Sequence, residues 1–224
     1  IVGYQHTAVF RESLSIVQPP LKSPVTPPDL VLCLGPIPLE MMREGHAQHG
    51  THFMPFGSLR SQAKTMTSGR ADSARRTILV TPEGIPSEVR ILFAFVAACA
   101  QQLPSYTFLL RCHPQVPMTA ALGMVSEDLT QYPNVVLSSA GRLEEDFARA
   151  SALLYRGSST VTYAIIHGLL PIYLSQGTAN RDPIYQMTQW RRRCSDPHEF
   201  AEVLTRYEET PPDQSDAEWS VARD

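Results

Sequence analysis

The chain lacks several features that would place it in one of the large functional classes. Its 224 residues contain no run of 18 apolar residues, so no segment is predicted to span a membrane. The net charge is only −3, which excludes the broad positive field of many nucleic-acid-binding proteins, and we expect no nucleic-acid partner. The four cysteines lie far apart, which favours reduced thiols over a disulfide framework. These absences together predict a cytoplasmic protein.

The motifs of two common nucleotide-binding sites are also missing. There is no Gly-x-x-x-x-Gly-Lys loop, and no Gly-x-Gly-x-x-Gly segment follows a predicted strand, which disfavours a kinase-type or nicotinamide-type site. The His and Cys residues show no metal-ligand spacing, so we expect neither a metal ion nor a bound cofactor. No signal-peptide pattern is visible. The first residues, from Ile1, look like the end of a buried strand, and we therefore expect that an N-terminal part is absent.

The chain does contain a regular alternation of short apolar strands and helical segments, with a hydrophobic content of 43% that suffices for a sizeable core. Strands are predicted at residues 1–4, 29–35, 51–56, 77–81, 106–111, 134–137, 152–155 and 171–174, and helices at 36–44, 87–102, 141–150 and 196–207. This alternation predicts an α/β fold with parallel sheets covered on both faces. The polar segment 61–76 predicts a linker between a first domain at 1–60 and a second at 77–224.

Three of these predictions concern single elements. The run at 29–35 is almost entirely apolar, as expected for a strand buried on both faces. Ser87 is predicted to cap the helix that follows it. The basic run 191–193 is predicted to be a solvated surface, with contact to an anionic acceptor or a membrane as the alternative.

The most informative segment runs from Ala152 to Leu174. It is predicted to be a strand, a small polar turn made of Gly157, Ser158, Ser159 and Thr160, a helix and a second strand. Backbone N–H groups at the start of a helix lack intrahelical acceptors and sit at its positive end, where they can hold an anion. The turn therefore predicts a phosphate site. The alternative is that these hydroxyls only cap the helix, and Arg156 meets either the phosphate or a nearby acid.

A second polar segment, Arg111-Cys112-His113-Pro114, follows another predicted strand. Ligands of open parallel sheets bind outside the carboxyl ends of the strands, so this segment and the turn at 157–160 are expected at one edge. His113 can donate a hydrogen bond to a phosphate or a ribose hydroxyl, Arg111 can supply charge, and Pro114 fixes the exit of the loop. A surface histidine is the alternative. His6 follows a strand of the first domain and is a candidate general base, or a structural loop histidine.

The order of these motifs resembles the C-terminal half of glycosyltransferases of the GT-B type. The resemblance is carried by residues 109–114, 157–160 and 168–172, and in the first half by residues 3–6 and 28–31. A His-Pro pair followed by a Ser-Ser pair looks most like bacterial enzymes of surface polysaccharide synthesis that use CMP-activated sialic acid or Kdo. The spacing is also similar to CDP-glycerol glycerophosphotransferases, which usually carry an acid before the Ser pair where this chain has Arg156 and Gly157.

The resemblance implies a GT-B-like pair of Rossmann-like domains, the N-terminal one incomplete and on the acceptor side, the second binding a nucleotide sugar. The implied reaction is metal-independent transfer of a sugar, from a CMP-sugar donor in the favoured case, to a surface glycan or lipid-linked acceptor at the inner face of the membrane. His113, Ser158 and Ser159 would hold the donor phosphate, and His6 would deprotonate the acceptor. The alternatives are a CDP-glycerol-type glycerophosphotransferase, a nucleotide-sugar 2-epimerase and a non-catalytic nucleotide-binding module.

Overall fold

The computed structural model describes residues 1–5, 27–45, 50–58, 76–177, 181–185 and 191–209. The chain divides into two compact units, one made of residues 1–64 with 179–183 and the other of residues 65–178 with 184–224. The predicted linker at 61–76 lies outside the described residues except for Arg76, so the predicted boundaries stay predictions.

The first unit contains a parallel sheet of three strands in the order β1 (Val2–Tyr4), β2 (Leu30–Cys33) and β3 (His52–Pro55). Helix α1 (Pro36–Gly45) covers one face of this sheet, where Val31 and Cys33 pack against Leu39 and Met42. Leu30 and Leu32 are only half-buried. The prediction of burial on both faces is therefore wrong for β2, because successive residues of a strand point to opposite faces and α1 covers just one of them.

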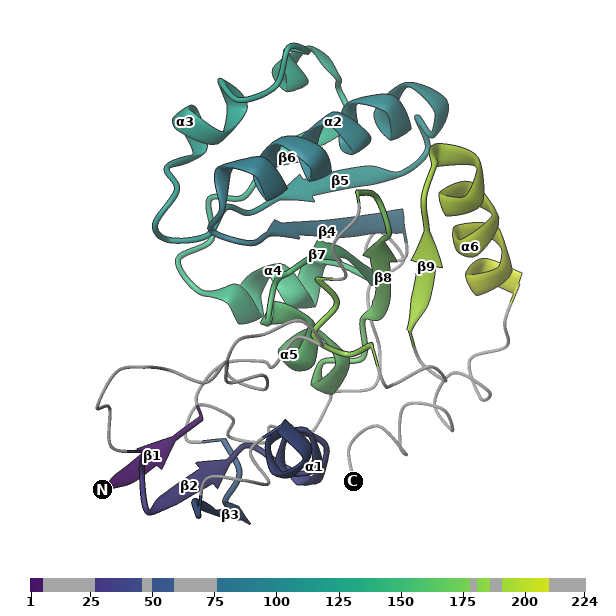
Figure 1. Ribbon diagram of the computed structural model, residues 1–224. Coiled ribbons are helices and arrows are strands. Elements are labelled where there is room, and N and C mark those ends of the chain that lie inside the picture. Colours follow the sequence, from purple (N-terminus) through teal and green to yellow (C-terminus); the bar gives the residue numbers. More distant parts are fainter. Residues whose placement is uncertain (6–26, 46–49, 59–75, 178–180, 186–190, 210–224) are drawn as a thin grey trace. The chain divides into compact units, whose positions relative to one another are not determined.

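The second unit is built on a parallel sheet of six strands in the order β6-β5-β4-β7-β8-β9 (Figure 1). The strands are β4 (Thr77–Pro82), β5 (Thr107–Leu110), β6 (Val135–Leu137), β7 (Ala152–Arg156), β8 (Leu170–Leu174) and β9 (Arg192–Cys194). From β4 the chain moves outward to β5 and β6, and then returns to the other side of β4 for β7, β8 and β9. The strand order thus reverses its direction between β4 and β7. These parallel sheets confirm the predicted α/β fold.

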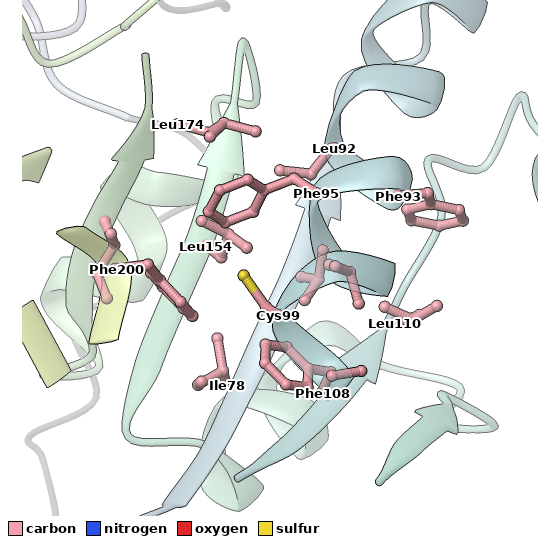
Figure 2. Close-up of a cluster of buried hydrophobic side chains, with 14 of the residues drawn as sticks. Ile78, Leu92, Phe93, Phe95, Cys99, Phe108, Leu110, Leu154, Leu174 and Phe200 are labelled. Atoms are coloured by element: carbon pink, nitrogen blue, oxygen red, sulfur yellow. The ribbon is translucent and has the colours of Figure 1, made fainter. Parts of the chain in front are cut away.

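Helices cover both faces of the six-stranded sheet. One face carries α2 (Pro86–Gln102), α3 (Met118–Leu122) and α6 (Pro197–Glu209), and the other carries α4 (Leu143–Arg149) and α5 (Thr160–Ile166); a short 3-10 helix, η2 (Leu129–Gln131), precedes β6. Figure 2 shows the core beneath α2, where Phe95, Phe108 and Phe200 surround Cys99. The rings of Phe95 and Phe200 meet edge to face with centroids 5.6 Å apart. Core packing on two faces leaves the strand ends as the place for polar chemistry.

One local prediction differs from the structure, and one strand was not predicted. Helix α2 begins at Pro86 with Ile85 as its N-cap, so Ser87 lies inside the first turn and is not the cap. Proline suits the first helical position because its fixed φ matches the helix and its missing N–H would have no partner there. The strand β9, at the edge of the sheet, was not predicted; it contains Arg192 and Arg193 of the basic run. Arg193 is exposed and Arg192 is half-buried, which is compatible with the predicted solvated surface. Charged side chains are common on such edges, where they hinder pairing with other chains.

Within the described ranges, every helix is too short or too polar to traverse a lipid bilayer.

All four cysteines are expected to react slowly with thiol reagents while the protein is folded. Cys33, Cys99 and Cys194 are buried, Cys112 is half-buried, and all are free thiols. Burial raises the pKa of Cys112 to about 11 and that of Cys194 to about 12, so at pH 8 roughly one thiol in a thousand or fewer is ionised. Labelling with dithionitrobenzoate should be at least about tenfold slower than in urea, with Cys112 reacting first. Equal rates in both states would contradict the buried positions.

Candidate functional site

The candidate site lies at the carboxyl edge of the six-stranded sheet, where the strand order reverses between β4 and β7. At such a reversal, the chain segments after the two neighbouring strands run to opposite sides of the sheet. Open α/β sheets usually bind their ligands between these segments, outside the carboxyl ends of the strands. The loop after β4 begins with Glu83 and Gly84, the loop after β5 contains His113, and the loop after β7 begins with Gly157. All three therefore start at this edge, as the sequence predicts.

His113 and Pro114 form a tight turn in the loop after β5. The N–H of Val116 donates to the carbonyl of His113 at 2.8 Å, and proline at the second position of such a turn has the required φ. The N–H of Gln115 donates to Nδ1 of His113 at 3.3 Å. An imidazole that accepts at Nδ1 carries its hydrogen on Nε2 when neutral. The exposed His113 ring therefore presents Nε2–H as a donor, which suits an anion or a hydroxyl oxygen.

Gly84 provides the space for this ring. A Cβ added at Gly84 would lie 2.8 Å from Nδ1 and 3.0 Å from Cγ of His113, which is closer than side chains approach one another. The imidazole of His113 therefore packs directly on the backbone that follows β4, and a glycine at this position is a condition of that packing.

Gly157 provides the space for the side chain of Glu83, as Gly84 does for His113. Its φ is +72°, in the left-handed region that favours glycine, and a Cβ added there would collide with the carboxylate of Glu83, lying 3.0 Å from its Cδ. The Glu83 side chain thus packs against the first residue of the turn after β7. His113, Gly84, Glu83 and Gly157 form a continuous series of contacts along the carboxyl edge.

The serines of the turn play different structural roles. Ser158 is buried, and its Oγ accepts from the N–H of Thr160 at 3.4 Å. Ser159 is the N-cap residue of α5, is exposed, and makes no capping hydrogen bond with its side chain in the described structure. Ser158 therefore bonds one N–H at the start of α5 from the position before the N-cap. The exposed hydroxyl of Ser159 and the half-buried Thr160 lie at the start of α5.

Arg111 is joined to a buried carboxylate. Its Nη1 donates to Oδ2 of Asp146 at 2.6 Å and to the carbonyl of Ala140 at 3.1 Å. Ser138 donates to the same carboxylate oxygen at 2.6 Å, and Asp146 is completely buried. Arg111 thereby fixes the loop after β6. Removing one partner of a buried ion pair costs about 3–5 kcal/mol, so substitution of Arg111 would test stability more than phosphate binding.

Arg156 also has an acidic partner. Its Nε lies 2.5 Å from Oε2 of Glu88 in the first turn of α2, and both side chains are buried. Of the two alternatives for Arg156, pairing with a nearby acid is therefore the one seen.

The structure brings most of the predicted site residues to one edge. His113 and Pro114 lie in one turn, Gly157, Ser158, Ser159 and Thr160 in another, and Arg111 points to the α4 side.

His6 lies outside the described residues, so its proposed role stays a prediction. Residues 82–84 were expected at this edge because they follow the strand predicted at 77–81, but no role was assigned to Glu83 itself. In the ranges that the structure describes, no group of three or more His, Cys, Asp or Glu side chains could hold a metal ion.

No protein-family model matches the sequence, and neither does any curated protein. Solved structures of similar fold include two glycosyltransferases and a wall teichoic acid polymerase. The glycotransferase of kitacinnamycin is 15% identical with a TM-score of 0.58, over 88% of this chain and 50% of its own. The calicheamicin glycosyltransferase CalG4 is 14% identical with a TM-score of 0.54, over 87% and 47%. The wall teichoic acid polymerase TagF is 15% identical with a TM-score of 0.56, over 98% and 62%.

The chain thus spans about half the length of the first two of these structures. At this level of identity the likeness concerns the fold, and it confirms the GT-B-like architecture expected from the sequence.

Proposed function

We propose that this protein transfers a sugar from a nucleotide-activated donor, with a CMP-sugar favoured, to a surface glycan or lipid-linked acceptor at the inner face of the membrane. The observation that carries the proposal is the reversal of strand order between β4 and β7. It gathers the His113 ring and the turn at 157–160 at one edge of a fold shared with solved glycosyltransferases.

The proposed chemistry is stabilisation of the leaving phosphate. As the bond from the sugar to the phosphate breaks, negative charge builds on the phosphate oxygens, and donors already in position lower the barrier. Nε2–H of His113 and the hydroxyls of Ser158 and Ser159 are these donors in our proposal, with Thr160 and the backbone of Gly157 beside them. His6 would take the proton from the attacking hydroxyl. No residue in this scheme needs a metal ion.

A thermal-shift series with CMP, CDP, UDP and GDP tests the binding step, because a ligand that binds only the folded state raises its melting temperature. We expect at least one of these nucleotides, with CMP or CDP favoured, to stabilise the protein, in EDTA as well as in magnesium. The double variant Ser158→Ala with Ser159→Ala should lose most of this shift and at least about tenfold in turnover. An unchanged shift in the double variant would exclude the turn as the phosphate site, and strict dependence on magnesium would exclude metal independence.

A second candidate is a CDP-glycerol-type glycerophosphotransferase. Two observations favour it: the match to the wall teichoic acid polymerase covers 98% of the chain, and the Glu83 carboxylate lies against Gly157, directly before the Ser pair. In this second proposal Glu83, in the loop after β4, would take the place of the acid that such enzymes usually carry before this pair. Incubation with CDP-glycerol and with a CMP-sugar, each with a lipid-linked acceptor, separates the two functions by the product formed. Binding without transfer from either donor would favour the non-catalytic module.

A further inference from the structure

One guanidinium group at the carboxyl edge contacts several of the segments that form the candidate site. Arg156 is the last residue of β7 and directly precedes Gly157. Its side chain is only 3% exposed. Besides the contact of Nε with Glu88, its Nη1 donates to the carbonyl of Leu174 at 3.1 Å and to the Tyr173 hydroxyl at 3.4 Å. The Arg156 side chain therefore links β7 with α2 and with the end of β8.

The same guanidinium also lies against the loop after β8. A Cβ added at Gly177 would lie 3.3 Å from Nη2 of Arg156, and Gly177 has a φ of +77°. Glu88, on the other side, fixes the first turn of α2, which directly continues the loop carrying Glu83 and Gly84. Three loops of the carboxyl edge, after β4, β7 and β8, are thus attached to one buried cation.

A buried ion pair of this kind is poorly explained by stability. Removing two charges from water costs several kcal/mol per ion, and well-packed apolar side chains of similar volume often replace such pairs without loss of stability. Apolar side chains cannot reproduce the directional hydrogen bonds of the pair. A guanidinium group is planar and donates hydrogen bonds in fixed directions to a carboxylate and to carbonyl oxygens. The geometry of Arg156 therefore fits a role in setting the position of these loops.

We propose that Arg156 is a positioning residue: together with Glu88 it holds the turn at 157–160 and the loop after β8 in the arrangement that binds the donor phosphate. This inference rests on the proposed function for the ligand, but the loop arrangement can be measured without it. Arg156 itself is buried beneath the loops, so it acts through Gly157 and Gly177 and not by contact with the donor.

The decisive variant replaces both charges, Glu88→Met with Arg156→Met, so that neither is left buried and unpaired. We expect its melting temperature to stay within a few degrees of the wild type while nucleotide affinity falls at least about tenfold. Amide hydrogen exchange at residues 157–160 and 175–177 should accelerate at least about tenfold. The single variant Arg156→Lys keeps the charge but loses the fork, and should show the same two changes to a smaller extent.

The control variant is Arg76→Met with Glu208→Met. It removes another Arg–Glu pair, with Nε and Oε1 3.0 Å apart, from the amino edge of the same sheet. Its nucleotide affinity and its exchange at the loops should match the wild type. Unchanged exchange and affinity in the Glu88 and Arg156 double variant would overturn the inference, and if that variant does not fold, the same result in Arg156→Lys would do so. Absence of nucleotide binding by the wild type would count against the proposed function alone, because loop exchange would still report on Arg156.

Discussion

Replacing Gly157 with alanine is expected to destabilise the second unit and to weaken nucleotide binding at least about tenfold. Two costs add at this position. A φ of +72° brings an alanine Cβ too close to the neighbouring carbonyl, at about 1–2 kcal/mol. The Cβ also collides with the Glu83 carboxylate, which must leave the turn. Urea denaturation measures the loss in the free energy of unfolding. Calorimetric titration with the nucleotide that stabilises the wild type measures the loss of nucleotide affinity.

Gly168 offers the matched control for this prediction. Its φ of +68° places it in the same backbone region, but it follows α5 and precedes β8, at the amino edge of the sheet. Gly168→Ala should therefore lower the free energy of unfolding by a similar backbone cost while leaving nucleotide affinity unchanged. If both alanine variants lost affinity equally, the effect would reflect stability, and the turn at Gly157 would have no special part in binding.

Replacing His113 with alanine is expected to reduce turnover between about tenfold and a hundredfold with little effect on stability. The ring is exposed, so few buried contacts are lost. A hydrogen bond to a charged group is worth about 1.5–3 kcal/mol, which corresponds to this range of rates. The loss should appear mainly in kcat, because the bond strengthens as charge develops on the leaving phosphate. Steady-state kinetics alongside urea denaturation separate the two quantities.

A pair of amide variants tests which ring nitrogen is used. Glutamine places its amide near the position of Nε2 and asparagine near that of Nδ1, so His113→Gln should retain more activity than His113→Asn if Nε2–H is the donor. Gly84→Ala displaces the ring without changing its chemistry and should approach the effect of His113→Ala. Full turnover in His113→Ala would remove the residue from the proposed mechanism.

The fold could be predicted from local patterns because each strand of the core is a short apolar run between polar turns. Leu79, Leu109 and Leu153 sit in such runs and are completely buried. Strand β9 was missed because two of its three residues are arginines and only Cys194 contributes to the core. The start of α2 was shifted because a serine is a good cap in isolation, whereas the chain uses Ile85 before a proline.

The site could be predicted as a set of loops but not as a set of contacts. Parallel strands fix which loops share an edge, and this places His113 with the turn at 157–160. The partners of the two arginines do not follow from any local pattern, since Arg111 meets Asp146 35 residues later and Arg156 meets Glu88 68 residues earlier. Such pairs depend on how helices lie across the sheet. Their positions became visible only in three dimensions.

The two close approaches at Gly84 and Gly157 have a consequence for protein engineering. Two side chains at the carboxyl edge each need a glycine in the loop after the neighbouring strand: the imidazole at 113 needs residue 84, and the carboxylate at 83 needs residue 157. Transplanting His113 or Glu83 alone onto another parallel sheet should therefore fail, whereas moving each with its glycine should succeed. A mutant library of this edge would need to vary position 113 together with 84, and position 83 together with 157.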